Sequence, residues 1–172
     1  MKYPEYSFPL AKEQSNMSNA LPLSTLMLEL PQLMERLHRR FLDVVRLEMT
    51  RAGIRDINPV QIMMLATIGN QDMAVRDLIE RGYYLGSNAS YNIKNLAEGG
   101  YLERLTDEHD RRSARVRITP KGQKVIDQLN ILGDKMGKDL LPNEKDKDDY
   151  QISLRLMRRF ERECSTLIHA SE

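Results

Sequence analysis

The sequence predicts a mainly α fold with one small β-hairpin, an α+β arrangement in which helices dominate. Three observations support this fold class. Apolar residues recur at steps of three and four over most of the chain, as on amphipathic helices. Two short strand-like runs, 101–106 and 113–119, enclose a highly charged segment. Asn58-Pro59 and Thr119-Pro120 each combine an N-cap residue with a proline suited to the first helical turn, and so predict helix starts around this region.

Composition fits a soluble, helix-rich protein. The 172 residues are 41% hydrophobic and 30% charged, and the formal net charge is +1. This length allows one domain with a sizeable core. The single cysteine, Cys164, excludes an internal disulfide framework and fits a reducing compartment. Because no stretch approaches the length of a membrane span and the N-terminus lacks the apolar region of a secretory signal, we expect a cytoplasmic protein that does not bind membranes.

The N-terminal part of the chain predicts an arm followed by a long helix. Residues 1–21 carry prolines and a polar Ser/Asn cluster, so we expect an arm with little structure of its own. Helical character begins near Ser24 and ends at Gly53, and Pro31 either occupies a first helical turn or marks a kink. The helix is too long for a small domain to cover, so part of its apolar stripe should meet another chain. The stripe consists of Met34, Leu37, Phe41, Val44 and Val45.

The next segments predict a core helix and a helix-turn-helix unit. A nearly all-apolar helix should run from Asn58 to Gly69 and form the centre of the core. A shorter helix is expected over 73–82, with residues 83–86 as the turn. The second helix of the unit should begin at Ser87, a good N-cap, and end at the glycine pair 99–100.

This second helix has an apolar and a polar side. Ala89, Ile93, Leu96 and Ala97 recur at helical spacing and predict the buried side. Hydroxyl and amide groups on the other side could reach base edges in a DNA major groove, and the helix N-terminus favours phosphate. An ordinary solvated surface is the simpler interpretation of this helix taken alone. The polar side carries Tyr91, Lys94, Asn95 and Glu98, with Ser87 and Asn88 at its N-terminal end.

The two strand-like runs predict a β-hairpin whose tip is the charged segment D-E-H-D-R-R. Basic residues gather at and beyond this tip, and such a patch attracts phosphate. A helix followed by a basic hairpin is the layout of a winged helix-turn-helix. The alternative is a solvated hairpin in which Asp107, Glu108 and Asp110 neutralise the arginines. The basic residues are Arg111, Arg112, Arg115, Arg117, Lys121 and Lys124.

The segments L-I-E-R, S-N-A-S-Y-N-I-K-N-L, G-Y-L-E-R and D-R-R-S-A-R-V-R-I-T-P-K-G resemble the winged-helix core of the MarR family of bacterial transcription regulators. The D-R-R wing followed by the I-T-P-K-G helix start is the most specific part, and the resemblance covers residues 58–124. The segment G-Y-Y-L-G-S-N-A-S-Y-N-I-K is also similar to the LdtR-like branch of this family.

The resemblance implies specific DNA contacts. Asp110 and Arg112 match the wing pair, with Arg112 as the side chain that enters the minor groove. The chain departs from the usual pattern at three recognition positions, because Asn88 and Ser90 stand where Thr is common and Tyr91 where Arg is common. The operator sequence therefore does not carry over. With the polar side of the helix and the basic hairpin included, the expected DNA-binding residues are Ser87, Asn88, Ser90, Tyr91, Lys94, Asn95, Asp110, Arg111, Arg112 and Arg115.

The C-terminal part predicts two more amphipathic helices. The first starts at Thr119-Pro120 and the chain breaks at Pro142-Asn143. Their apolar stripes exceed what one subunit can bury, which predicts a two-fold homodimer. We therefore expect an N-terminal arm (1–21), a winged helix-turn-helix domain (58–124), and a helical dimerisation region (22–57 and 125–172). The stripes carry Val125, Leu129, Leu132, Met136 and Leu140, then Leu156, Phe160, Cys164, Leu167 and Ile168.

No catalytic motif, metal site or cofactor site is evident. His38, His109 and His169 lie on separate elements without ligand-like spacing, so we expect no bound metal. The family resemblance implies a small aromatic or phenolic effector in a crevice between the winged core and the dimerisation helices. For each candidate, plain core packing is the competing interpretation. The candidate residues are Met34, His38, Met63, Met64 and Thr67.

These observations predict a homodimeric, sequence-specific DNA-binding regulator of the MarR type. It would bind a pseudo-palindromic operator in double-stranded DNA and be released by a small effector. One alternative is a winged-helix protein-interaction module that does not bind DNA. An enzyme with a site between subunits is another alternative, but no paired acids or Cys-His arrangement supports it.

Overall fold

The computed structural model of the protein describes residues 22–69, 71–82, 86–105 and 114–170. It divides the chain into two compact units, Met1–Phe41 and Leu42–Glu172. In the described ranges, no helix combines the length and apolar character that a membrane crossing requires.

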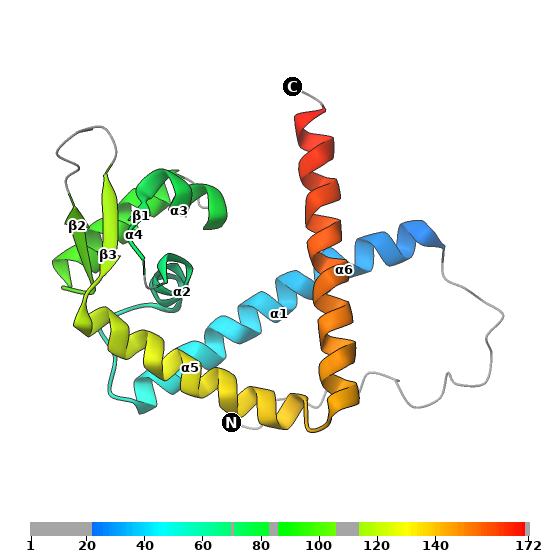
Figure 1. The fold of residues 1–172 in the computed structure, drawn as a ribbon, viewed down its shortest axis with the longest axis horizontal. Helices are drawn as coiled ribbons and strands as arrows, with labels where there is room; N and C mark the ends of the chain where they lie inside the picture. Colours follow the sequence, from blue (N-terminus) through cyan, green and yellow to red (C-terminus); the bar gives the residue numbers. More distant parts are fainter. Residues whose placement is uncertain (1–21, 70, 83–85, 106–113, 171–172) are drawn as a thin grey trace. The chain divides into compact units, whose positions relative to one another are not determined.

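The predicted fold class is confirmed, because helices dominate and the strands form one small antiparallel sheet (Figure 1). The residues described from Leu42 onward include the complete winged unit apart from the segments just named. The elements are α1 (Leu23–Arg51), α2 (Pro59–Ile68), β1 (Met73–Ala74), α3 (Val75–Gly82), α4 (Gly86–Glu98), β2 (Leu102–Leu105), β3 (Arg115–Ile118), α5 (Pro120–Leu140) and α6 (Glu144–His169).

The helix starts follow the predicted capping signals. Asn58 caps α2 in a capping box, since its Oδ1 accepts from the Gln61 amide at 2.9 Å and Gln61 Oε1 accepts from the Asn58 amide at 3.0 Å. Thr119 caps α5 by accepting from the Gly122 amide at 3.2 Å. Asn143 caps α6 in the same way. In α1, Pro31 lies inside the helix, so the alternative that placed it in a first turn is wrong.

Two predicted boundaries are wrong by one or two residues. Met73 and Ala74 were expected in the helix 73–82 but form strand β1, because they pair with Val116 and Arg115 of β3. The helix expected to start with Ser87 as its N-cap already begins at Gly86, which places Ser87 in the first turn. Both errors arise where contacts from distant segments decide the backbone conformation.

The sheet has the strand order β1-β3-β2, with both pairs antiparallel. In the register of β2 and β3, Leu102 lies opposite Ile118 and Glu103 opposite Arg117. Figure 1 shows β3 leading directly into α5. The hairpin therefore connects the end of α4 to the start of α5.

Helix α2 is the centre of the core. Ile62, Met64 and Leu65 are completely buried, and α2 contacts α3, α4, α5 and β3. Leu78 of α3 and Val116 of β3 are likewise completely buried. A central apolar helix thus fixes the helix-turn-helix and the hairpin on one scaffold, as the sequence predicted.

Gly122, in the first turn of α5, allows a close approach that provides a test of this packing. A Cβ at this position would lie 2.3 Å from the Tyr101 carbonyl oxygen and 2.8 Å from Ile118 Cγ2. Gly122→Ala should therefore lower the free energy of unfolding by about 1–3 kcal/mol through overpacking, measured by urea denaturation.

Gly133→Ala in the same helix is the matched control, because a Cβ there meets no atom of the described structure within 4 Å. Alanine should stabilise that position by roughly 0.5–1 kcal/mol through its higher helix propensity. Equal effects of the two substitutions would contradict the close packing of Gly122 against Tyr101.

Candidate nucleic-acid interface

Helix α4 has a buried apolar side and an exposed polar side. Ala89, Ile93 and Leu96 are at most 1% exposed, as the periodicity predicted. The core holds this side in place, so the polar side can be reached without unfolding. The exposed residues include five of the expected DNA contacts: Ser87, Asn88, Ser90, Tyr91 and Lys94.

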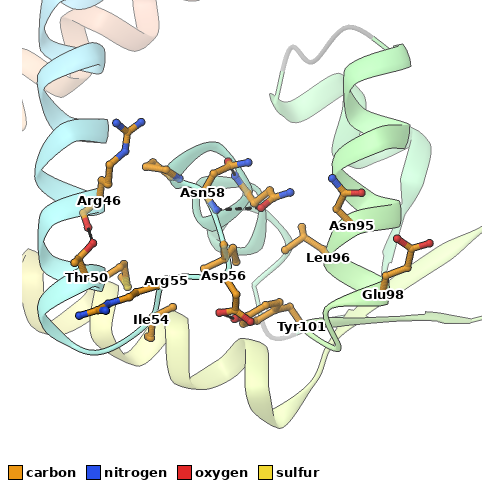
Figure 2. A pocket seen from close by; sticks show the side chains of 14 residues that line it. Arg46, Thr50, Ile54, Arg55, Asp56, Asn58, Asn95, Leu96, Glu98 and Tyr101 are labelled. Atoms are coloured by element: carbon orange, nitrogen blue, oxygen red, sulfur yellow. Dashed lines mark hydrogen bonds between the residues drawn. The ribbon is translucent and has the colours of Figure 1, made fainter.

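Two expected contacts in α4 have a more specific environment. Lys94 Nζ lies 3.7 Å from Glu98 Oε1, and both side chains are largely exposed. Such a pair contributes little energy, so Lys94 can exchange Glu98 for a phosphate at small cost. Asn95 is half-buried and lines a cleft beside α4 (Figure 2). It is therefore less accessible to a DNA duplex than Tyr91, which is 65% exposed.

The tip of the wing lies outside the described residues. Asp110, Arg111 and Arg112 all belong to the segment 106–113. Their expected DNA contacts remain predictions, and so does the alternative in which acidic residues of the tip neutralise these arginines.

The strand arginines of the hairpin are bound within the subunit. Arg115 is half-buried, and its Nη2 donates to the Asp72 carbonyl oxygen at 2.8 Å. Arg117 donates from Nε and Nη2 to the two carboxylate oxygens of Asp72 at 2.5 and 2.6 Å, a bidentate arrangement. Its Nη1 also lies 3.4 Å from Glu103 Oε1. Arg115 and Arg117 thus hold β3 to the segment before β1.

This pairing changes the ionisation of both groups. Hydrogen bonds from the Arg117 guanidinium lower the pKa of the Asp72 carboxyl below its ordinary value. The Asp72 carboxylate in turn raises the pKa of Arg117. The sequence analysis missed Asp72 because the residues after it were assigned to a helix, which hid their pairing with β3.

A second junction, centred on Tyr101, holds the C-terminal end of α4. Tyr101 is 3% exposed, and its amide donates to the Leu96 carbonyl at 2.8 Å. Its hydroxyl donates to Asp56 Oδ1 at 2.5 Å. Lys121 donates from Nζ to Asp56 Oδ2 at 3.0 Å and lies 4.0 Å from the centroid of the Tyr101 ring. We call these three residues, Asp56, Tyr101 and Lys121, the Tyr101 junction.

The pKa values at the Tyr101 junction follow from these contacts. Hydrogen bonds from the Tyr101 hydroxyl and then from Lys121 lower the pKa of Asp56. Burial and then the Asp56 hydrogen bond raise the pKa of Tyr101, and Asp56 raises the pKa of Lys121. At neutral pH the junction therefore contains a carboxylate, a neutral phenol and an ammonium group.

An open cleft of about 880 Å³ lies between the C-terminal part of α1, the connection to α2, and the last turns of α4 (Figure 2). Its lining mixes apolar, amide and charged side chains, and includes Asp56 and Tyr101. Asn95 lines it too, whereas the other expected DNA contacts of α4 do not.

The residues expected to bind an effector are distributed over both units. Met34 and His38 belong to the first unit and are exposed. Met63 and Thr67 of α2 are half-buried, and the Thr67 hydroxyl donates to the Met63 carbonyl at 3.0 Å. Met64 is completely buried, which matches its core-packing alternative.

Three comparisons with known proteins bear on this surface. A family model described as a winged helix DNA-binding domain matches residues 57–122. The exopolysaccharide II synthesis transcriptional activator ExpG of Rhizobium meliloti (strain 1021) is 37% identical over 133 residues, which cover 77% of this chain and 69% of ExpG.

Solved structures share the fold at lower sequence identity. Streptococcus pneumoniae FabT in complex with DNA has a TM-score of 0.69 at 16% identity, with 79% of this chain and 97% of FabT covered. A MarR transcriptional regulator from Methanosarcina mazei Go1 has a TM-score of 0.65 at 23% identity, with 79% and 96% covered.

The Tyr101 junction predicts an acid-sensitive contribution to stability. Because its partners lower the pKa of Asp56 below 3.8, the unfolded chain takes up this proton first as the pH falls. The contribution is full above the ordinary pKa and is lost as the pH falls through the lower pKa of the folded state. Asp56→Asn should therefore flatten the decline of unfolding free energy below about pH 4, measured by urea denaturation at a series of pH values.

Asp139→Asn in α5 is the control, because Asp139 is exposed and has no hydrogen-bond or ion-pair partner among the residues that the structure describes. This variant should keep the pH dependence of the wild-type protein. Parallel profiles for Asp56→Asn and wild type would show that the junction does not hold its proton equilibrium in solution.

Proposed function

Since this chain belongs to the MarR family of winged-helix, DNA-binding transcriptional regulators, we propose that it acts as a homodimer on a pseudo-palindromic operator. It is a regulator and not an enzyme. The observation that carries the proposed mode of binding is the exposed polar side of α4, held by a fully buried apolar side beside a β-hairpin.

In the proposed complex, α4 enters a major groove and the tip of the wing reaches the adjacent minor groove. Tyr91 and the small polar residues around it would contact bases and phosphates. Arg112 would enter the minor groove. Arg115, in contrast, would support the wing from within, because its guanidinium is bound to the Asp72 carbonyl.

The long peripheral helices support the proposal of a homodimer. Helix α6 has 26 residues, of which none is buried in the described structure. Its Ile152 and Leu156 are 53% and 60% exposed. In water a helix of this kind depends on packing of its apolar side. We propose that regions 22–57 and 125–172 provide this packing between two copies, while region 58–124 binds DNA.

The effector remains part of the proposal. A small aromatic or phenolic molecule near Met34, His38, Met63, Met64 and Thr67 would bind one arrangement of the two winged lobes better than another, and so release the operator. Placement in the LdtR-like branch also remains a proposal, supported by the segment around Tyr91. A regulator of promoter DNA would act in the cytoplasm.

Titration of labelled DNA duplexes tests the proposed function. A palindromic promoter fragment should bind more tightly than a scrambled duplex of the same length, and both affinities should fall with rising salt as counterions are released. Two half-sites should lie about one helical turn apart. Equal affinity for the two duplexes would exclude sequence-specific binding.

Substitutions in the proposed DNA-binding surface should weaken operator binding without unfolding the protein. Arg112→Ala and Tyr91→Ala should each cost about 1–3 kcal/mol of operator affinity. Arg51→Ala, at the end of α1 and paired there with Glu48, should leave affinity unchanged. An unchanged operator affinity in either surface variant, with the thermal transition preserved, would remove that residue from the interface.

The dimer can be tested on α6. Leu156→Glu should dissociate the dimer, because the proposed interface would bury an unpaired carboxylate. Gln151→Glu adds the same charge at a position about 140° around the helix and should leave the dimer intact. Analytical ultracentrifugation measures both, and a dimer that persists in Leu156→Glu would place the interface elsewhere.

A further inference from the structure

We propose that the cleft beside α4 binds a small organic carboxylate with an apolar body, and that its occupation changes DNA affinity. The regulatory half of this inference rests on the proposed function, whereas the binding half does not. The cleft of about 880 Å³ falls within the range of roughly 300–1,000 Å³ typical of small-molecule sites. It includes none of the five residues expected to bind an effector.

The inner part of the cleft is apolar. Met49 of α1 and Leu96 of α4 are 2% and 1% exposed, and Ile57 of the connection to α2 is 9% exposed. These side chains come from three different segments, all within the second unit. They offer a surface on which an aromatic or aliphatic body can bury itself.

The charges around this apolar surface favour an anion. Arg46 and Arg55 line the cleft, and neither guanidinium has a hydrogen-bond or ion-pair partner within the described ranges. The two acidic residues of the lining are both compensated. Asp56 accepts from Tyr101 and Lys121, and Glu98 pairs with Lys94. The uncompensated charge in the cleft is therefore positive.

Gln61 adds a hydrogen-bond donor. It lines the cleft and is only 7% exposed. Its Oε1 accepts from the Asn58 amide, but its Nε2 has no partner among the described residues. Because no side-chain nitrogen or oxygen there is buried without a partner, Nε2 must face open space, and the cleft provides it. A carboxylate oxygen is the acceptor that this donor and the two arginines share.

The cleft adjoins the structure that fixes the recognition helix. Figure 2 shows Asn95, Leu96 and Glu98 of α4 on one side and Arg46 and Thr50 of α1 on the other. The Tyr101 junction forms part of the wall through Asp56 and Tyr101. A carboxylate held by Arg55 lies next to Asp56 in sequence and would repel its carboxylate, which weakens the hold of the junction on the end of α4.

Calorimetry with 2-naphthoate tests the site in the absence of DNA. We expect 2-naphthoate to bind the full-length protein and to raise its melting temperature. The neutral analogue 2-naphthamide should bind at least about tenfold more weakly, since it lacks the charge. The double substitution Arg46→Gln with Arg55→Gln should weaken naphthoate binding by about tenfold or more, whereas the matched control Arg51→Gln should not.

Gln61→Glu gives a second variant that can keep the fold. Glutamate at this position preserves the capping box of α2 and places a like charge against the ligand, so naphthoate binding should be lost. A normal thermal transition without ligand would show that the variant is folded.

The outcomes separate this inference from the proposed function. Equal binding of naphthoate and naphthamide, or equal loss in the double variant and Arg51→Gln, would overturn the anion site. A loss of operator affinity in the double variant without naphthoate would assign the two arginines to DNA phosphates and overturn it as well. Naphthoate binding that leaves operator affinity unchanged would refute the regulatory half, whereas failure of wild type to prefer its operator would refute the proposed function alone.

Discussion

The hydrogen-bonded surroundings of Tyr101 are the constraint on which the winged unit depends. The backbone of this residue accepts from the Thr119 amide at 3.1 Å and donates to Leu96 at 2.8 Å, while its side chain reaches Asp56. One buried residue thus joins the end of α4, the start of the hairpin, the cap of α5 and the connection between α1 and α2. The close approach of Gly122 to the Tyr101 carbonyl leaves this arrangement little freedom. The direction of α4 and the position of the wing are therefore coupled, as a protein that reads two grooves at once requires.

Asp72 performs a related task at the other edge of the sheet. Its carboxylate and carbonyl bind Arg117 and Arg115, so the arginines that seemed part of a DNA-binding patch stabilise the wing instead. Strand β1 has only two residues and would hold β3 weakly through its backbone alone. The ion pair supplies the missing attachment. The basic character of the hairpin thus has two separate origins, internal support along β3 and the arginines of the tip.

Local signals were predictable from the sequence and long-range pairings were not. The starts of α2 and α5 followed from Asn58 and Thr119, because a cap and a first-turn proline act within four residues. The buried side of α4 followed from the spacing of Ala89, Ile93 and Leu96. Strand β1 could not be predicted, since Met73 and Ala74 carry no periodic pattern and gain strand geometry only by pairing with β3. Tyr101 with Asp56, and Arg117 with Asp72, each join residues 45 positions apart, and no local pattern indicates such pairs.

The distribution of charge explains how a chain of net charge +1 can serve a DNA-binding family. Lys94, Arg117 and Lys121 each have an acidic partner within the subunit, so much of the positive charge near α4 is already compensated. Electrostatic attraction, which does not depend on sequence, supplies most of the affinity for random DNA. A surface with few free cations gains little from it, and the balance shifts toward hydrogen bonds and shape at the bases. The small polar side chains and Tyr91 on α4 then determine where the protein binds, while the compensated charges keep it from binding everywhere.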